Sequence, residues 1–405
     1  MSVQTLKGFR DFLPSEAQKR RFLRSRMEQI FEKWGYQPLE TPTVEPLELF
    51  AGEIGEDEQL FYRFKDWGDR DVMLRYDQTA PTCRVIGEKF NDLVFPFRRY
   101  QIQPAFRAEK PQKGRYREFT QADLDIFGVA SPTADAEIIA VTLDLCRSLG
   151  FTKAVALINN RDLMKDIPYP AIAAIDKLEK IGAEKVISEM ISKGIAKEQA
   201  EKYLEKVKNI KPDSVINTIF SYLKDSGIPD DWYRFEPTLA RSFSYSQGPI
   251  WEIVIPGYTA GSVGGGERYD KLLERISGRD IGATGIGIGF DRLLEACEQF
   301  NLIPPLSSVP RVLVSVFSKE LYSPAIQLSS SLRQSGIPVE IYPDPDTKLD
   351  KQFKYASRRG IPYVAVLGPE EIEKNLIGLK YLETGVQSRL TLENTVSLLQ
   401  TLPNL

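Results

Sequence analysis

The sequence predicts an α+β protein whose core is an antiparallel β-sheet flanked by helices, with a helical insertion and a separate C-terminal α/β domain. Three observations predict this. Short strand-like runs separated by a polar loop fill residues 71–127. Residues 164–227 are rich in Ala, Lys, Glu and Ile at helical spacing. A proline-rich run at residues 301–310 then precedes a pattern of alternating strands and helices.

Composition sets the size and the broad class. A chain of 405 residues that is 42% hydrophobic can bury a large core and form two or three domains. The formal net charge of −3 gives no general attraction to a polyanion, so any contact with nucleic acid must use a local basic face. No run of about 18 apolar residues and no signal-peptide pattern occurs, so we expect no membrane association.

The cysteines indicate the cellular compartment. Cys83, Cys146 and Cys297 are far apart and odd in number, which argues against a disulfide framework and a cysteine-based zinc site. A reducing cytoplasm fits this usage best.

The chain contains no histidine. This absence removes the commonest general base, the commonest metal ligand and all Ser-His and Cys-His nucleophile pairs. Chemistry by Arg, Lys, Asp and Glu remains, and it suits positioning and charge stabilisation in phosphoryl or nucleotidyl transfer.

The first half of the chain contains most of the predicted core. Apolar residues at helical spacing predict a helix over 15–34, followed by a proline-punctuated extended strand over 36–45. The strands of 71–127 should form an antiparallel sheet. A helix at 133–149 and an apolar strand at 153–158 follow.

The second half resumes the core and then leaves it. Residues 250–255 predict a strand, and the glycine-rich segment GIGIGFDRL predicts a strand running into a helix. Short apolar strands of the C-terminal domain are expected at 311–317, 338–342 and 362–367. The predicted domains are a core in two parts (1–163 and 231–302), the insertion (164–230) and the C-terminal domain (310–405).

The densest polar cluster lies on two strands joined by a basic loop. Because side chains alternate along a strand, Arg107 and Glu109 share one face. The following strand presents a second such set on one face: Phe119, Gln121, Asp123 and Asp125. Such a floor suits ATP, with Arg107 on a phosphate, Arg115 from the loop on the outer phosphates and Phe119 stacked on the base. The alternative is a solvated hairpin with weak ion pairs.

Three further residues are candidates for the same site. Arg292 follows a glycine-rich strand that would let backbones approach closely; the alternative is tight core packing with Arg292 at the surface. Asp77 could hold a cationic amino group and Arg241 a carboxylate or acyl phosphate. A turn-forming Asp and a surface Arg are the alternatives for these two.

These pieces, in this order, resemble the class II aminoacyl-tRNA synthetases, and among them the histidyl-tRNA synthetase family. Residues 20–45 resemble motif 1, FRAEKPQKGRYREFTQADLDIFG resembles motif 2 and GIGIGFDRL resembles motif 3. LARSFSYSQGPIWE and SVGGGERYDKL resemble two signatures of the histidine family, and residues from 311 onward resemble its anticodon-binding domain. The resemblance implies a class II catalytic core, ATP and Mg²⁺ as cofactors, tRNA as partner and a homodimer built through motif 1.

The resemblance also implies roles for residues. It places Arg107 and Arg292 on the ATP phosphates, with Glu109 and Arg115 beside them and Phe119 under the adenine. Arg241 would be a catalytic cation near the α-phosphate, acting with Arg107.

For the amino acid, the resemblance places Asp77 and Thr79 at the amino group, Gln121 at the carboxylate and Asp125 at the imidazole. The chain departs from the family pattern where two adjacent tyrosines are expected, since Tyr245 is followed by Ser246. Glu267 also replaces a glycine. Losing one hydrogen bond to the substrate costs about 1–3 kcal/mol, which weakens the inference of histidine specificity.

The sequence therefore predicts a histidyl-tRNA synthetase that forms histidyl-adenylate and transfers histidine to tRNA. Two alternatives stay open: a synthetase-like paralogue that binds or senses histidine in a regulatory role, and a synthetase with altered amino-acid choice. The presence of Arg107, Arg115 and Arg292 and of the C-terminal domain favours the enzyme. A histidine-free chain also suggests that this protein could still be translated when histidine is scarce.

Overall fold

The computed structural model divides into two compact units, each of which is considered by itself. The structure describes residues 3–50, 59–110, 115–241, 246–306 and 309–401. The larger unit comprises Met1–Leu13 and Lys19–Pro304, and the smaller comprises Pro305–Leu405 with Pro14–Gln18. The division after Pro304 falls inside the proline-rich run, where prolines limit the regular backbone pairing that would extend either unit.

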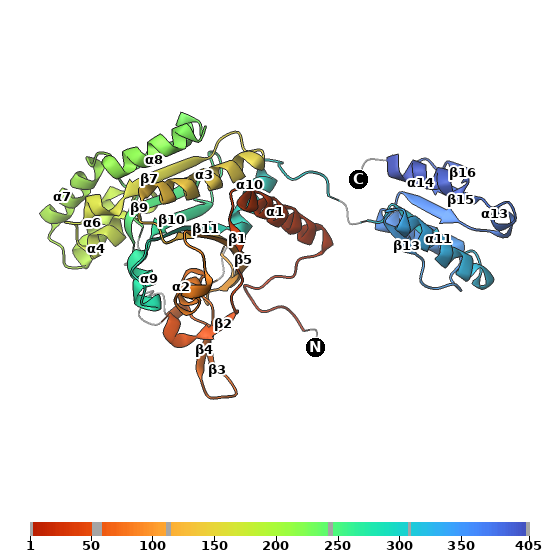
Figure 1. The fold of residues 1–405 in the computed structure, drawn as a ribbon, viewed down its shortest axis with the longest axis horizontal. Coiled ribbons are helices and arrows are strands. Elements are labelled where there is room, and N and C mark those ends of the chain that lie inside the picture. The colour runs from red at the N-terminus through yellow and green to blue at the C-terminus, as the bar shows by residue number, and fades with distance from the viewer. Residues whose placement is uncertain (1–2, 51–58, 111–114, 242–245, 307–308, 402–405) are drawn as a thin grey trace. The chain divides into compact units, whose positions relative to one another are not determined.

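An eight-stranded sheet forms the centre of the larger unit (Figure 1). Neighbouring strands are antiparallel except at the two edges, where β1 pairs with β5 and β8 pairs with β7 in parallel. In spatial order the strands are β1 (Gln37–Pro38), β5 (Phe97–Phe106), β6 (Glu118–Phe127), β11 (Ala283–Gly289), β10 (Gly264–Arg268), β9 (Gln247–Val254), β7 (Val155–Asn160) and β8 (Tyr233–Phe235). The predicted antiparallel core is confirmed.

The main hydrophobic core lies between this sheet and a group of helices. α1 (Pro14–Lys33) contributes Leu23, Met27 and Phe31, which recur at helical spacing and are fully buried. The group also contains α3 (Pro132–Ser148), α8 (Ser214–Asp225) and α10 (Phe290–Gln299). α8 packs on α3 although the sequence placed it in the insertion, because its buried face meets the core helix rather than the insertion.

The helices of the insertion bury a separate apolar cluster. They are α4 (Tyr169–Ile175), α5 (Leu178–Ile181), α6 (Ala183–Ser192) and α7 (Lys197–Lys208). Ala240 and Ile250 of the core join this cluster, so the insertion packs against β9 of the eight-stranded sheet.

A smaller layer covers the remaining part of the larger unit. A three-stranded antiparallel sheet contains β2 (Val44–Pro46), β4 (Asp71–Leu74) and β3 (Arg63–Lys65). α2 (Thr79–Glu88) packs on α9 (Asp270–Ser277). The sequence predicted only strands over residues 71–127, and α2 corrects that prediction: Asp77 accepts hydrogen bonds from the backbone N–H groups of Thr79 and Ala80 and so starts a helix there.

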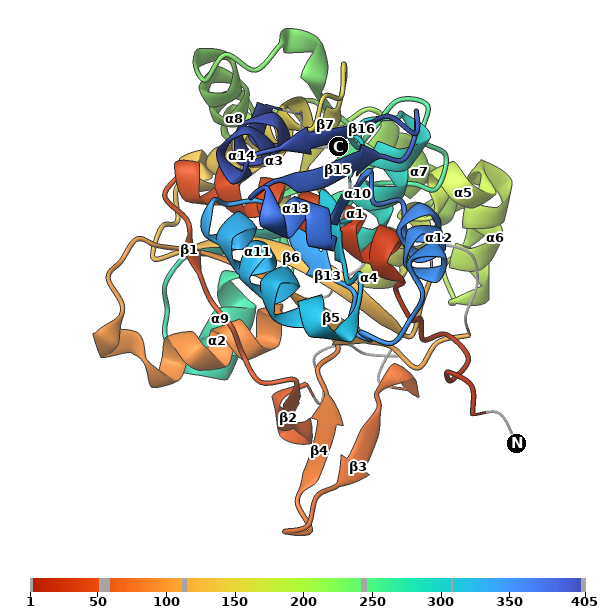
Figure 2. The same ribbon diagram turned by 90° about the vertical axis from the view of Figure 1, so that its right-hand side faces the viewer.

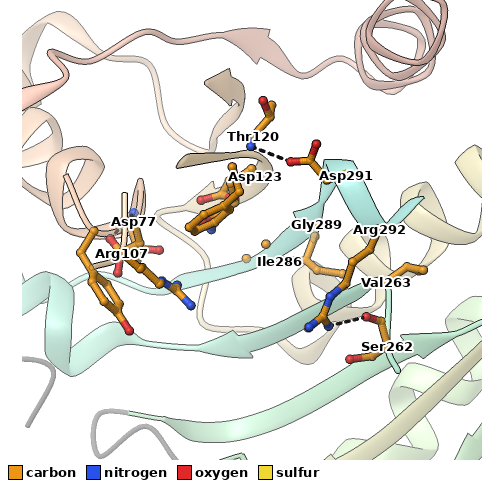
Figure 3. Close-up of a pocket in the computed structure, with 18 of the residues that line it drawn as sticks. Asp77, Arg107, Thr120, Asp123, Ser262, Val263, Ile286, Gly289, Asp291 and Arg292 are labelled. Atoms are coloured by element: carbon orange, nitrogen blue, oxygen red, sulfur yellow. Dashed lines mark hydrogen bonds between the residues drawn. The ribbon is translucent and has the colours of Figure 1, made fainter. Parts of the chain in front are cut away.

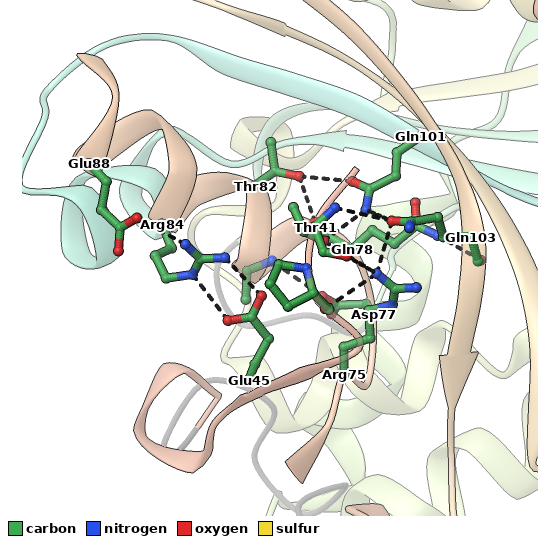
Figure 4. Close-up of polar contacts among 12 residues, drawn as sticks. Thr41, Glu45, Arg75, Asp77, Gln78, Thr82, Arg84, Glu88, Gln101 and Gln103 are labelled. Carbon is green, nitrogen blue, oxygen red and sulfur yellow. Dashed lines mark hydrogen bonds and ion pairs between the residues drawn. The ribbon is translucent and has the colours of Figure 1, made fainter. Parts of the chain in front are cut away.

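A buried polar network fixes the segment that precedes α2 (Figure 4). Arg75 is fully buried and donates to the carbonyl oxygens of Thr41 (2.9 Å) and Pro104 (2.6 Å) and to Gln103 Oε1 (2.9 Å). Beside it, Arg84 of α2 forms a two-pronged ion pair with buried Glu45. These charged groups are tolerated because each finds polar partners, and together they hold Asp77 in a defined place.

The smaller unit is a five-stranded α/β domain (Figure 2). Its strand order is β13 (Val339–Ile341), β12 (Val312–Ser315), β14 (Tyr363–Val366), β15 (Ile377–Tyr381) and β16 (Gln387–Leu390). The first three are the predicted strands, and they pair in parallel, whereas the antiparallel β15–β16 hairpin was missed. Its helices are α11 (Tyr322–Gln334), α12 (Leu349–Arg359), α13 (Pro369–Glu373) and α14 (Leu392–Thr401).

A search of the described residues for a helix able to cross a membrane finds none.

One buried ion pair ties β10 to α3 and yields a stability prediction. Arg268 Nη2 lies 2.7 Å from Asp135 Oδ2, and both side chains are almost fully buried. Arg268→Met should lower the free energy of unfolding by about 3–5 kcal/mol, because it leaves a buried carboxylate without its cation. All four tryptophans (Trp34, Trp67, Trp232 and Trp251) lie in the larger unit, so their fluorescence during urea unfolding reports on that unit alone.

The pH dependence of this loss has a defined sign. Burial raises the pKa of Asp135 to about 6 although Arg268 opposes the rise, so removing Arg268 should raise that pKa further. The destabilisation should then be smaller at pH 5, where the carboxyl is neutral, than at pH 8. Lys153→Met is the control. It breaks the exposed ion pair with Asp231 and should hardly change the midpoint of urea unfolding. Equal losses for the two variants would contradict the prediction.

Candidate active site

A cavity of about 480 Å³ lies in the larger unit, and we call it the central cavity (Figure 3). It brings together side chains that are far apart in sequence. Every predicted site residue that the structure describes, apart from Ser246, lines it: Asp77, Thr79, Arg107, Glu109, Arg115, Phe119, Gln121, Asp125, Arg241 and Arg292. Tyr245 lies outside the described residues.

Alternation along β11 keeps the cavity floor open. The side chains of Ile286 and Ile288 are buried in the main core, and the intervening glycines face the cavity side of the sheet. Gly285 pairs with Asp125 of β6, and a Cβ at position 285 would collide with that carboxylate. The absence of a side chain therefore leaves room for polar groups of β6 to lie over the neighbouring strand.

One side of the cavity is rich in carboxyl groups. Asp77, Asp123 and Asp125 line it, and burial raises the pKa of each of them. For Asp123 the pKa reaches about 8, although the guanidinium of Arg99 acts in the opposite direction. Fully buried Arg99 lies 2.7 Å from Asp125, which also accepts a hydrogen bond from the hydroxyl of Tyr269. This side can accept a cationic or hydrogen-bond-donating ligand.

Among the described residues, two buried polar atoms on this side have neither a hydrogen-bond partner nor an ion-pair partner. They are Oδ1 of Asp123 and Oε1 of Gln121. Buried polar atoms are nearly always paired, so an unpaired set that faces a cavity favours binding of a polar ligand there. Gln78 donates to the backbone carbonyl of Gln121 at 3.1 Å and so supports the position of this strand.

Asp77 has a structural role in addition to its place in the cavity. Its carboxylate Oδ1 accepts from the backbone N–H groups of Thr79 (3.0 Å) and Ala80 (3.3 Å). The turn-forming role that was left open for this residue is therefore present. The same hydrogen bonds orient the carboxylate, which still lines the cavity.

Arginines also line the cavity: Arg107 lies beside Asp77, and Arg292 lies farther along (Figure 3). The guanidinium of Arg107 lies over the rings of Tyr76 and Phe119, with its carbon 4.3 and 5.1 Å from their centroids. Arg292 Nη1 donates to the carbonyl oxygen of Ser262 at 3.1 Å, as Figure 3 shows. Planar guanidinium groups held in this way suit phosphate oxygens.

The ion pair between Glu109 and Arg115 lies at a more exposed part of the cavity lining. Arg115 Nη1 is 3.3 Å from Glu109 Oε2, and the Arg115 side chain is half exposed. An exposed pair of this kind is weak, so an incoming phosphate can compete for the guanidinium.

Arg241 reaches the cavity from a strained backbone position. Its φ is 44°, which is uncommon for a residue with a side chain. Its guanidinium nitrogens lie 3.5 Å from Glu267 and 3.9 Å from Glu252. A Cβ on Gly265 would collide with this guanidinium, so the glycine lets Arg241 lie directly on β10. Strain at such a position is typical of functional sites.

Ser246 differs from the other predicted site residues. It is buried, and its hydroxyl donates a hydrogen bond to Glu267, which does line the central cavity. Sequence reasoning treated Glu267 only as a departure from a pattern and gave it no role. The contact with Ser246 is the structural signal that sequence alone lacked.

Arg99 and Tyr269 were also missed. A signal for Arg99 was present, because Arg99, Gln101 and Gln103 place polar side chains at every second position of an otherwise apolar strand. Polar residues on the inward face of a strand indicate a buried network or a site. Tyr269 gave no comparable signal, since an aromatic residue next to a helix start is ordinary core.

Comparison with known proteins agrees with this geometry. The chain matches the family model described as "Histidyl-tRNA synthetase" over residues 8–207 and the one described as "Anticodon binding domain" over residues 311–402. A histidine–tRNA ligase of Cytophaga hutchinsonii is 33% identical over an alignment that covers 96% of this chain and 98% of that protein.

Solved structures give the same picture. The crystal structure of histidyl-tRNA synthetase from Nostoc sp. PCC 7120 has a TM-score of 0.81 at 27% identity and covers 99% of both chains. An ATP phosphoribosyltransferase regulatory subunit/histidyl-tRNA synthetase from Bacillus halodurans C has a TM-score of 0.71, covering 88% of this chain and 97% of that one; at 22% identity it shares the fold alone. The full-length sequence match, together with the two family models, shows that the chain belongs to the histidyl-tRNA synthetase family.

Proposed function

We propose that this protein is a histidine–tRNA ligase, which activates histidine with ATP and transfers the histidyl group to tRNA. The observation that carries the proposal is the central cavity itself. Guanidinium and carboxyl groups line the same space, so a triphosphate and an amino acid can lie there together.

The arginine side would bind ATP and stabilise the developing charge. Arg107 and Arg292 bind phosphate oxygens. Arg115 leaves its ion pair with Glu109 and binds the outer phosphates instead. An oxygen of the histidine carboxylate attacks the α-phosphorus of ATP in line, and the new P–O bond forms as the bond to the leaving pyrophosphate breaks. Arg107 and Arg241 stabilise the negative charge of the pentavalent transition state. Orientation in the cavity supplies an effective molarity of about 10⁵ M or more, so no general base is needed.

Mg²⁺ fits this arrangement as an ion held mainly by the nucleotide. The described residues contain no group of three or more side chains able to hold a metal, and Glu109 offers one carboxylate on the phosphate side. Mg²⁺ commonly binds through one or two carboxylates plus phosphates, and when bound it neutralises phosphate charge.

The carboxyl side would bind the amino acid. Asp77 and the Thr79 hydroxyl hold the α-amino group, Gln121 orients the α-carboxylate, and Asp125 lies toward the side chain. Phe119, whose ring faces the guanidinium of Arg107, would stack on the adenine.

The smaller unit would bind tRNA. α12 carries a basic face whose residues line a second hollow of about 580 Å³, formed by Tyr342, Lys351, Lys354, Tyr355, Arg358 and Arg359. Cations interleaved with aromatic rings suit phosphates and unstacked bases. We also propose a cytoplasmic homodimer, on the resemblance of residues 20–45 to motif 1 and on the cysteine usage.

A synthetase with altered amino-acid choice is the second candidate, favoured by Ser246 and Glu267. A regulatory histidine-binding role is less well supported, because the phosphate-side arginines and the anticodon-binding domain are both present.

Amino-acid-dependent ATP–pyrophosphate exchange tests the proposal. Among a panel of all amino acids, histidine should be the one that drives exchange, and purified tRNA should then accept labelled histidine. Exchange driven by another amino acid would support the second candidate. A lack of exchange with every amino acid, combined with histidine binding, would support the regulator.

Replacing Arg241 tests the source of catalysis. Arg241→Met should lower kcat for exchange about 10²- to 10³-fold with a small change in KM for ATP, because the charge acts mainly in the transition state. Gly265→Ala should also lower kcat, since the added Cβ displaces the same guanidinium. Unchanged kcat in both variants would remove Arg241 from the mechanism.

The raised pKa of Asp123 gives a pH prediction. At pH 7 this carboxyl is mainly protonated in the free protein, because its pKa is about 8. Binding of a cationic amino group at Asp77, in the same cavity, favours the ionised form of Asp123, so KM for histidine should fall as pH rises from 7 to 8.5, by at most about tenfold per unit. Asp123→Asn should flatten this profile, and Asp346→Asn on the exposed surface should not. A profile that persists in Asp123→Asn would show that another group is responsible.

A further inference from the structure

We propose that Glu267, positioned by Ser246, is the residue that recognises the side chain of the amino-acid substrate, by accepting a hydrogen bond from a ring N–H. This inference rests on the proposed function and deepens it. Glu267 lines the central cavity, and it has no role in the ATP binding and adenylate formation proposed above.

Glu267 lies in one row with Asp125 across three strands. Glu267 of β10 pairs with Gly285 of β11, and Gly285 pairs with Asp125 of β6. The Cα atoms of Glu267 and Asp125 are therefore roughly 10 Å apart, which is two strand spacings. Because Gly285 has no side chain, the carboxylate of Asp125 can lie over β11, on the side toward Glu267. Both carboxylates line the cavity.

Ser246 gives Glu267 its orientation. The buried Ser246 hydroxyl donates to Oε2 of Glu267, and Arg241 Nη2 lies 3.5 Å from Oε1. A carboxylate oxygen has two lone pairs, so each oxygen keeps capacity for a further donor. Ser246 and Glu267, at two of the positions where the sequence departs from its family's pattern, are thus in direct contact. The small side chain of Ser246 leaves space, and the carboxylate of Glu267 provides a hydrogen-bond acceptor there.

The chemistry of this pair selects the ligand. Each oxygen of the buried Glu267 carboxylate keeps a lone pair that Ser246 and Arg241 do not use. An aliphatic side chain, or one that offers only an acceptor, would exclude water and leave this lone pair unpaired at a desolvation cost, so it is rejected. A side chain with a ring N–H is accepted. Histidine meets this requirement.

The alternative role for Glu267 is only to hold Arg241 in place. Glu252 of β9 provides the matched control, because its carboxylate also lies near Arg241, at 3.9 Å, but it does not line the cavity. If Glu267 acts through Arg241, removing either charge should lower kcat in a similar way. If Glu267 contacts the substrate, only its removal should raise KM for the amino acid.

The experiment measures histidine-driven ATP–pyrophosphate exchange in the full-length protein. Glu267→Gln should raise KM for histidine about 10- to 100-fold with kcat changed less than about threefold, because a charged acceptor becomes a neutral one. Glu252→Gln should leave KM for histidine unchanged. An unchanged KM in Glu267→Gln, or the same fall in kcat in both variants, would overturn the assignment.

A double-mutant cycle tests the part of Ser246. Ser246→Ala should raise KM for histidine less than Glu267→Gln does, and the double variant should be no worse than Glu267→Gln, because the two residues act as one unit. Additive effects would remove Ser246 from the assignment. If Glu267→Gln does not fold, judged by tryptophan fluorescence, Glu267→Asp replaces it; this variant keeps the charge but shortens the reach, and a wild-type KM would overturn the proposal.

Failure of this inference is separable from failure of the proposed function. Wild-type protein that shows no histidine-driven exchange contradicts the function. Wild-type protein that is active with histidine while Glu267→Gln keeps its KM contradicts only the assignment of Glu267.

Discussion

The structure depends on burying several carboxyl groups in the middle of a β-sheet beside one fully buried guanidinium, that of Arg99. Charges at this depth are tolerated only when hydrogen bonds or ions satisfy them. Arg99 serves Asp125 directly, and the network around Arg75 holds the segment that carries Asp77. Oδ1 of Asp123 has no hydrogen-bond partner among the described residues, and Asp123 lines the cavity. The same buried arrangement therefore offers an acceptor to a polar ligand.

Steric openness is the second requirement, and glycines supply it in two different ways. On β11, glycines alternate with isoleucines. The isoleucine side chains fill the core on one face, and the glycines leave the other face free for the side chains of β6. On β10, Gly265 lets a guanidinium lie against the backbone. Three sheet strands therefore contribute to a site in which few side chains stand between the two kinds of ligand.

Much of this could be predicted from sequence because it depends on local periodicity. Alternation placed Phe119, Gln121, Asp123 and Asp125 on one face, and these four line one cavity. What was missed depends on tertiary contacts. α2 begins because a single carboxylate caps it, α8 joins the core through its contact with α3, and Glu267 gains meaning only beside Ser246. The functional roles of the site residues remain predictions.

The lack of histidine has a consequence for proton exchange in this molecule. Burial raises the pKa of Cys146 and Cys297 to about 12 and that of Cys83 far above its usual value, so thiols do not titrate near neutrality. Among the described residues, burial raises the pKa of Asp123 to about 8 and that of Asp135 to about 6, so these two carboxyl groups take up or release protons between pH 5 and 9. Potentiometric titration of the whole protein in that range would consequently act as a reporter on its sheet interior, without the background that imidazoles give in other proteins.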